Sequence, residues 1–486
     1  MRTKSTLQRF FRNFSSLVVG KVLGDVFTFA FFVLLSRTFG KDGIGQYSFA
    51  IALTGFFVVF SEFGLNTLSI KEMSRDNESL LEYFGNILCL RVLLATVVFV
   101  LMFAVLPFLG LSREMVVVII IIGIYQVLYS LVDGVGSIFI ARQDMHFVGL
   151  VEMSLKMTTA IAGIIAIKVG AGLIPVLLVL PAVSFIHLFI VYLIVVKKYG
   201  RPVFRLSIAK MKITLREAVP YGLSMFLIQL NSRLDVVFLG FLVGSAGAGI
   251  YNVGYRVVFM ILFLPRFIGT TLFPIASKLF MESHSKLQEI YNKALGFSCL
   301  IGLPLASGLC LIAPELIRVV FGEEFMESSE ILRYLSWLLF LIFLRVTMGN
   351  FLTACDRQTD KTKSQFFAAC LNIVGNAVLI PLLGIKGAAI ATLLSELLLV
   401  FLFALRTKDI LGWPKIGSRL AIGSLATLSF VGPLFFYDVR ALIVTIPVAV
   451  IVYAVVLIFF KETRNNEVQI MVRLLKGGFR KETQTG

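Results

Sequence analysis

Long apolar segments separated by short polar turns run through this chain, and they constrain its fold more than any single motif. Hydrophobic residues make up 58% of the sequence and the mean hydropathy is +0.93, whereas soluble domains contain roughly 45–50% apolar residues. A helix that crosses a bilayer needs about 20 mostly apolar residues, and these segments have that length. The sequence therefore predicts an all-α polytopic membrane protein.

About fourteen segments meet this requirement. They are expected at residues 16–36, 45–64, 85–108, 115–140, 148–169, 173–195, 217–243, 249–273, 294–313, 331–354, 366–382, 384–405, 418–436 and 442–460. The interruption at Gly384–Gly387 is brief, so about twelve or thirteen segments is the alternative count.

Turn residues of the first half recur in the second half at nearly constant spacing. The matched sets are Gly40, Gly43, Gly45 and Tyr47 with Gly244, Gly247, Gly249 and Tyr251, and residues 139–144 with residues 351–356. Tight turns favour glycine in any protein, which is the competing explanation for the first match. A repeat that spans an even number of helices predicts two six-helix lobes with the same orientation, and a substrate path between them.

The repeat divides the chain into four predicted parts. These are an N-terminal lobe at residues 1–200 with six membrane helices, a basic cytoplasmic linker at 201–216, a C-terminal lobe of six helices at 217–405, and a terminal helix pair with a cytoplasmic tail at 406–486.

The net charge of +17 does not require a nucleic-acid partner, because the basic residues lie mostly in alternate turns. They concentrate at the N-terminus, in the 196–216 and 405–419 loops, and in the C-terminal tail. An excess of Lys and Arg marks the cytoplasmic side of a membrane protein. We therefore expect a multi-pass protein of the cytoplasmic membrane with both termini in the cytoplasm.

The cysteines and histidines are scattered along the chain. The five Cys and three His show neither metal-ligand spacing nor a disulfide framework, so no metal and no cofactor are expected. The charged segment before Ser15 is followed by a long predicted helix without a small-residue cleavage site, so we expect no removable signal peptide.

Ionisable side chains inside the predicted membrane segments point to function, because each costs about 2.5–3.5 kcal/mol to insert. The basic ones are Lys21, Arg91, Lys156, Arg233, Arg256, Arg266, Arg333 and Arg345, and the acidic ones are Asp25, Asp133, Glu152, Asp235 and Glu396. Spacing of four residues predicts local pairs of Lys21 with Asp25 and of Glu152 with Lys156.

Three of these basic residues have a simpler explanation. Arg91 and Lys156 lie near the predicted cytoplasmic edge, and Arg333 lies near the outer edge. Long basic side chains at such positions snorkel to the interface.

Deeper polar residues form stripes that are expected to face a wet cavity. Gln229, Asn231, Arg233 and Asp235 share helix 217–243. Gln126, Tyr129 and Asp133 form a second stripe, and Arg256 and Arg266 lie on the segment at 249–273. An interhelical salt bridge between Arg256 and Asp235 is the competing explanation. Because bases outnumber acids, the set favours an anionic substrate, whose oxygens match guanidinium groups.

Short motifs in the same order connect this chain with a known family. They are Ser36–Tyr47, Phe63–Leu65 followed by Lys71–Arg75, Asp235–Tyr251, Phe273–Pro274, Phe321–Gly322 and Gly384–Ile390. Over nearly its full length the chain resembles the oligosaccharide flippases of the multidrug/oligosaccharidyl-lipid/polysaccharide exporter superfamily, which also contains the lipid II flippases.

This resemblance implies that a polyprenyl-pyrophosphate-linked oligosaccharide crosses the membrane by alternating access of two lobes, for cell-surface polysaccharide assembly. The candidate substrate contacts are Lys21, Arg233, Arg256, Arg266, Gln126, Gln229 and Asn231, and the candidate H⁺ or Na⁺ coupling sites are Asp25 and Asp235. The expected partners are the lipid-linked substrate, membrane lipids and the coupling ion.

Two other classes of function remain open. One is a cation-coupled exporter of drugs or other small molecules, which the same superfamily includes and which an acidic cavity would favour. The other is a membrane enzyme such as a glycan polymerase or glycosyltransferase, which needs a large external loop with catalytic groups. The longest predicted outer loop, Pro314–Glu330, is short. A transporter is therefore favoured over an enzyme.

Overall fold

The structure is a computed structural model that describes residues 2–75, 80–204 and 208–413, with isolated positions 417, 424, 427 and 428. Side chains are described from Gly20 onward, apart from a few positions. The predicted segments 418–436 and 442–460 and the tail lie outside these continuous stretches.

Every regular element in the described stretches is a helix, as expected. The helices are α1 (Arg2–Glu62), α2 (Leu65–Arg75), α3 (Leu80–Val105), η1 (Leu106–Leu109), α4 (Arg113–Ala141), α5 (Met145–Lys168), α6 (Leu173–Tyr199), α7 (Ile208–Leu242), α8 (Ser245–Ile261), α9 (Phe263–Glu282), α10 (His284–Phe321), η2 (Glu323–Phe325), α11 (Met326–Ala354), α12 (Gln358–Leu383) and α13 (Ile385–Leu411).

Eleven of the described helical runs are long and apolar enough to cross a membrane, and the run Gly20–Ser74 alone covers two of the predicted segments. The chain is thus a multi-pass membrane protein. The total of about fourteen segments stays a prediction.

Three boundaries differ from the sequence-based expectation. The segment predicted at 249–273 is interrupted at Leu262, because Pro265 lacks an N–H and its ring crowds the carbonyl of Ile261, which disfavours a continuous helix there. The predicted outer loop Pro314–Glu330 is largely helical and is interrupted at Gly322. The last part of the predicted linker is helical as well, since α7 begins at Ile208.

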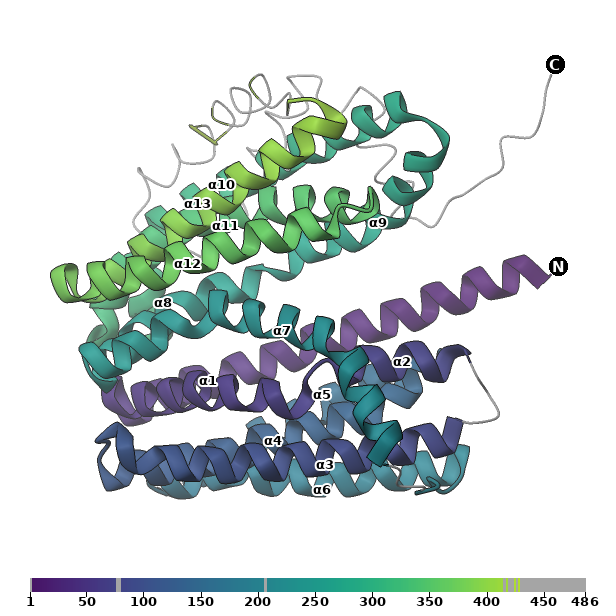
Figure 1. Ribbon diagram of the computed structural model, residues 1–486. Coiled ribbons are helices and arrows are strands. Elements are labelled where there is room, and N and C mark those ends of the chain that lie inside the picture. The colour runs from purple at the N-terminus through teal and green to yellow at the C-terminus, as the bar shows by residue number, and fades with distance from the viewer. Residues whose placement is uncertain are drawn as a thin grey trace, which may run out of the picture. The chain divides into compact units, whose positions relative to one another are not determined.

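A sharp reversal at Gly40 turns α1 into a helical hairpin (Figure 1). Gly40 has φ 64° and ψ −165°, a conformation that side chains essentially exclude. Gly244, its match in the second half, also has a positive φ, of 100°. The two matched glycines therefore make the corresponding turns between the first two helices of each half.

Other elements repeat in the same way. Helices α4 and α11 each contain 29 residues, and α6 and α13 each contain 27. Gly110 and Gly322 both have a positive φ, and so do Gly200 and Gly412. The two members of each pair are 212 positions apart in the sequence. The second half thus reproduces several helices and turns of the first, while the lobe boundaries stay a prediction.

The chain divides into two compact units. The first contains residues 1–256, 320–325 and 369–391, and the second contains 257–319, 326–368 and the described residues from Thr392 on. In the first unit α4 packs against α6 and α3, and α5 packs against α1. The core of the second unit surrounds Tyr291, Phe351 and Phe403.

Within the first unit, the two arms of the α1 hairpin contact different helices. The first arm meets α5 where Gly20 lies against the backbone of Gly149, the close approach that small residues allow between membrane helices. The second arm runs antiparallel to α7. The aromatic contacts along it are Phe49 with Phe241 at 5.1 Å between ring centroids and Phe56 with Phe226 at 6.4 Å.

Matched turns of the repeat contact each other in this unit. A β-carbon on Gly45 would overlap the carbonyl oxygen of Ser245. Three residues further on, the Nδ2 of Asn252 donates to the hydroxyl of Ser48 at 2.6 Å. Ser48 and Asn252 are themselves 204 positions apart, so equivalent positions meet, as they do around a local twofold axis.

A short polar cluster fixes the turn between α4 and α5. Asp144 accepts from Lys198 Nζ at 2.7 Å and from the hydroxyl of Tyr199. Partial burial raises the pKa of Asp144, but the two hydrogen bonds lower it by more. The pKa of Asp144 therefore lies below its ordinary value. The contribution of these hydrogen bonds to stability is present above the ordinary Asp pKa of about 3.9 and is lost as the pH falls through the lowered pKa.

We predict that Gly45→Ala destabilises the protein by about 1–3 kcal/mol, because the added methyl group overpacks the contact with Ser245. Gly136→Ala is the matched control, since Gly136 has open space around it and alanine favours a helix. Thermal unfolding in detergent should show a lower midpoint for Gly45→Ala and an equal or higher one for Gly136→Ala. Equal midpoints for Gly45→Ala and the wild type would contradict this packing.

Candidate functional site

All of the residues predicted from the sequence to bind substrate or couple ions, except Arg266, belong to the first unit. They come from α1, α4, α7 and α8. The α1 hairpin is central to this arrangement, because it contacts α4, α5 and α7.

Two arginines lie close together in this unit. Arg233 on α7 and Arg256 on α8 are electrostatic neighbours of each other and of the buried Tyr47. The guanidinium of Arg256 lies 5.2 Å from the ring centroid of Phe32, a cation–π distance. Arg233 makes no hydrogen bond and no ion pair within the described part of the chain. Two neighbouring cations repel each other, and an anion between them would remove that repulsion.

Two amide side chains meet next to α1. A β-carbon on Gly55 would overlap Nε2 of Gln229 and would lie 3.6 Å from Oε1 of Gln126. Gln126 also donates from Nε2 to the carbonyl of Ile51 at 2.9 Å and to the hydroxyl of Thr54 at 2.8 Å. Gln126 and Gln229 are therefore brought together, with Gly55 making room for them.

Asn231 and Asp235 differ in their surroundings. Asn231 is half-buried and makes no side-chain hydrogen bond in the described part of the chain. Asp235 is 4% exposed, and its carboxylate accepts from the hydroxyl of Tyr251 and from the amide of Val236 at 2.9 Å. Asp235 therefore links α7 to α8.

Asp25 takes part in an ion triad between α1 and α5. Lys156 Nζ lies 2.8 Å from Asp25 Oδ1 and 2.7 Å from Glu152 Oε1. The predicted Glu152–Lys156 pair is confirmed, but the predicted Lys21–Asp25 pair is wrong. The reason is that Lys156 extends across Gly24, so it reaches Asp25 from the neighbouring helix.

Lys21 is exposed and makes no hydrogen bond or ion pair within the described stretches. It is an electrostatic neighbour of Asp133 on α4. The structure thus leaves the ammonium group of Lys21 available to a ligand near Asp133.

Arg91 was expected to snorkel to the interface, and that expectation is wrong. Its side chain is only 1% exposed, and Nη1 donates to the carbonyl of Ser130 at 2.8 Å. Gly134 on α4 provides the space for the guanidinium. Sequence reasoning also missed Glu62 and Asn66 nearby, because both lie at the ends of apolar segments. The available signal in the sequence was Gly134 next to Asp133, since a glycine in a membrane helix can make room for a large side chain of another helix.

The second unit holds the remaining membrane charges, Arg266, Arg333, Arg345 and Glu396, and Arg333 is exposed. Arg266 is exposed, and its guanidinium lies 5.5 Å from the ring centroid of Phe259. Arg345 and Glu396 form an ion pair between α11 and α13. Pairing neutralises the charges of Arg345 and Glu396. The substrate role of Arg266 stays a prediction.

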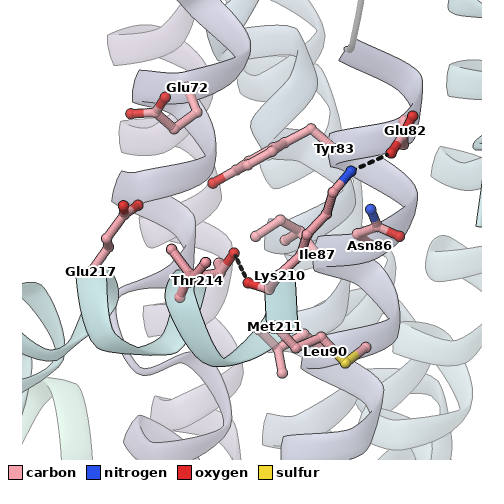
Figure 2. A pocket seen from close by; sticks show the side chains of 11 residues that line it. Glu72, Glu82, Tyr83, Asn86, Ile87, Leu90, Lys210, Met211, Thr214 and Glu217 are labelled. Atoms are coloured by element: carbon pink, nitrogen blue, oxygen red, sulfur yellow. Dashed lines mark hydrogen bonds and ion pairs between the residues drawn. The ribbon is translucent and has the colours of Figure 1, made fainter. Parts of the chain in front are cut away.

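A pocket of about 280 Å³ lies elsewhere in the first unit, between α2, α3 and α7. Figure 2 shows the phenol of Tyr83 pointing toward the side of the pocket where Glu72 and Glu217 lie. Lys210 Nζ pairs with Glu82 Oε1 at 2.9 Å. None of the predicted site residues lines this pocket. In the described stretches no group of three or more His, Cys, Asp or Glu side chains is arranged to hold a metal ion.

We predict that Lys156→Met destabilises the protein by about 1–3 kcal/mol, because it leaves Asp25 and Glu152 side by side without a counter-charge. The value lies below that of a fully buried pair because Asp25 is 37% exposed. In the triple variant Asp25→Asn, Glu152→Gln, Lys156→Met no charge remains, and most of the loss should be recovered. Thermal unfolding in detergent measures both. If the unfolding midpoint of Lys156→Met equalled that of the wild type, the triad would contribute nothing to stability.

Two proteins with similar sequences are named for the biosynthesis of glycans or polysaccharides. The chain is 24% identical over 252 residues to the probable low-salt glycan biosynthesis flippase Agl15 of Haloferax volcanii, an alignment that covers 50% of this chain and 53% of that protein. The chain thus spans about half the length of this relative. It is 21% identical to the capsular polysaccharide biosynthesis protein CapF of Staphylococcus aureus, over 79% of this chain and 96% of that one.

A solved structure shows the same fold. The lipid II flippase MurJ in an inward closed conformation superposes with a TM-score of 0.76 at 15% sequence identity, covering 92% of this chain and 99% of that one. The fold is thus that of MurJ, and a multidrug resistance MATE family transporter in an inward-facing conformation also shares it, with a TM-score of 0.68 at 14% identity.

Family models match both halves of the chain. Residues 220–378 match the MatE model, and residues 10–280, more than half of the chain, match the model described as "Polysaccharide biosynthesis protein". This match agrees with the family resemblance noted in the sequence. Together with the multi-pass helical fold, it shows that the chain belongs to the polysaccharide biosynthesis protein family.

Proposed function

We propose that this chain is a flippase that carries a polyprenyl-pyrophosphate-linked oligosaccharide across the cytoplasmic membrane, for the assembly of a cell-surface polysaccharide. The observation that carries the proposal is the neighbouring pair Arg233 and Arg256 inside a membrane unit. The family match and the names of the relatives, two of which are a probable glycan flippase and a lipid II flippase, support it.

A pyrophosphate suits this pair of arginines. Guanidinium groups form paired, charge-assisted hydrogen bonds with phosphate oxygens, and those bonds strengthen where water is excluded. Lys21 supplies further positive charge in this unit, and Arg266 of the second unit stays a separate candidate contact. Gln126, Gln229 and Asn231 would donate to and accept from the sugar hydroxyls, while the prenyl tail stays in the lipid. No covalent bond forms or breaks, so the protein acts as a transporter and not as an enzyme.

The two candidate coupling acids are not equivalent. Asp25 is partly exposed, shares Lys156 with Glu152, and is an electrostatic neighbour of Arg256. Its protonation would therefore change the charge seen by the substrate site. Asp235 is already held by Tyr251, so a coupling role for Asp235 requires that bond to open. We favour Asp25 as the H⁺ or Na⁺ site.

The proposed orientation places both termini in the cytoplasm, because the basic turns then lie inside. Lobes at 1–200 and 217–405 would rock around the linker at 201–216 to give alternating access. A ligand shifts such an equilibrium only as far as it binds one state better than the other.

A cation-coupled exporter of small molecules is the second candidate. The MatE match over residues 220–378 supports it, as does the carboxylate pair around Lys156. Ion-driven uptake of organic cations into proteoliposomes, without movement of lipid-linked glycans, would favour this function.

We predict that Arg256→Ala and Arg233→Ala each slow translocation about 10- to 100-fold, the equivalent of losing one ionic hydrogen-bonding contact worth about 1.5–3 kcal/mol. The assay follows a fluorescent polyprenyl-pyrophosphate oligosaccharide between the leaflets of liposomes that contain the purified protein. Arg256→Lys should be intermediate, since it keeps the charge but loses the planar fork.

The exposed Arg113 on α4 supplies the control variant, Arg113→Ala, which should flip at the wild-type rate. If the Arg233 and Arg256 variants also flipped the substrate at the wild-type rate, these two arginines would not be part of the substrate site.

A further inference from the structure

A buried guanidinium in the first unit lacks most of its hydrogen-bonding partners. Arg91 is 1% exposed, and only Nη1 has an acceptor, the carbonyl of Ser130 at 2.8 Å. Its Nε and Nη2 atoms are buried without a partner in the described part of the chain. Gly134 lies directly beneath the guanidinium, so a side chain there would displace it. The fold has thus made room for an arginine without satisfying it.

Unmatched acceptors belong to neighbouring residues, of which Glu62 and Asn66 are half-buried and Asp133 is exposed. Asn66 on α2 donates to Asp133 on α4, but Oδ1 of Asn66 is buried and has no donor within the described stretches. Glu62, the last residue of α1, makes neither a hydrogen bond nor an ion pair there. Both Glu62 and Asp133 are electrostatic neighbours of Arg91.

Buried donors and acceptors that lack protein partners, here Nε and Nη2 of Arg91 and Oδ1 of Asn66, indicate bound water. A water molecule can accept from Nε and Nη2 of Arg91 while it donates to the Asn66 amide oxygen or to Glu62. Arginine N–H groups cannot coordinate a metal ion, so Arg91 makes this position less suitable for Na⁺ than for water and a proton.

Charge balance then favours one bound proton. The surrounding charged groups come from four helices: Lys21, Asp25 and Glu62 on α1, Arg91 on α3, Asp133 on α4, and Glu152 and Lys156 on α5; Tyr129 of α4 is the neighbouring phenol. Arg256 of α8 neighbours Asp25 and balances this wider set, but at Arg91 itself two carboxyl groups, those of Glu62 and Asp133, face one buried guanidinium, which leaves one negative charge there. Low polarity makes such a surplus costly, and a proton removes it.

We propose that Glu62, Asn66, Arg91 and Asp133 form a hydrated proton-binding site, where one proton is held between the two carboxyl groups. This inference rests on the proposed function only for its purpose, which is to deliver the coupling proton to Asp25. The site itself stands on the burial of Arg91 and on the unmatched atoms around it.

Distances along the α1 hairpin support such a route. Glu62 is 22 residues beyond Gly40 and Asp25 is 15 residues before it, so the two lie about 33 and 22 Å from the turn. Glu62 is therefore about 10 Å nearer than Asp25 to the end that is cytoplasmic in the proposed orientation. Asp133 neighbours Glu152, and Lys156 joins Glu152 to Asp25, which acts on Arg256. The chain of charges runs from Glu62 to the substrate site.

The first test measures protonation without any transport. Infrared difference spectra of the purified full-length protein, recorded across a pH series, should contain the C=O band of a protonated carboxyl group. Asp133→Asn and Glu62→Gln should each reduce or remove this band, and Arg91→Gln should move the pH at which it is lost. Glu289→Gln is the matched control, because that carboxylate is 60% exposed and its loss should leave the band unchanged.

The second test separates this site from the proposed flippase function. In liposomes, Asp133→Asn should reduce by about tenfold or more the acceleration of flipping by a pH gradient, the equivalent of about 1.4 kcal/mol. A titrating band without any glycan flipping would leave the proton site standing and overturn the flippase. A carboxyl band that survives in both Asp133→Asn and Glu62→Gln would overturn the site. Binding of radioactive Na⁺ to the wild type that is lost in Asp133→Asn would also overturn it. Gel filtration confirms that each variant is folded, and Glu62→Gln, which lies on α1 instead of α4, serves if Asp133→Asn is not.

Discussion

Charged groups inside the bilayer are costly unless other helices supply partners, and this constraint shapes the first unit. Asp25 on α1 obtains its counter-charge from Lys156 on α5, and Lys156 is shared with Glu152. Asp133 on α4 accepts a hydrogen bond from α2. Because the Asp25–Lys156 and Asn66–Asp133 interactions join different helices, these polar residues tie together the same helices that apolar packing brings close.

Glycine makes these contacts possible in an unusual way. Small residues in membrane helices commonly let two backbones approach, as Gly20 and Gly149 do. Elsewhere in the unit a glycine admits a long polar side chain instead. Lys156 lies across Gly24, Gln229 across Gly55 and Arg91 across Gly134. Substituting any of these three glycines would therefore displace a charged or polar group rather than separate two helices.

The unit as described contains two electrostatic regions with different properties. Around Arg233 and Arg256 positive charge is in excess, which suits an anionic head group. Around Glu62 and Asp133 negative charge is in excess by one, which suits a proton. Asp25 lies between them as a neighbour of both Lys156 and Arg256. Proton binding and substrate binding are thus linked by one carboxylate, the arrangement that coupled transport requires.

Much of the fold followed from the sequence alone. Apolar segments of membrane-spanning length predicted the helices, and the repeated glycines at residues 40 and 244 predicted matching turns, because only a residue without a side chain accepts those backbone angles. The family resemblance rested on motifs spread along the chain. The break at Leu262 was missed, since apolar composition by itself does not reveal where Pro265 interrupts a helix.

The partners of individual charges depended on the tertiary structure. Spacing within one helix predicted the Glu152–Lys156 pair correctly but assigned Asp25 to Lys21, because sequence shows only neighbours on the same helix. Arg91 near a segment end suggested an interfacial side chain, yet the space beside Gly134 on another helix buries it. Sequence determined which segments enter the membrane, since insertion depends on local composition. Only the tertiary structure decided which charges meet, since that depends on how close separate helices approach.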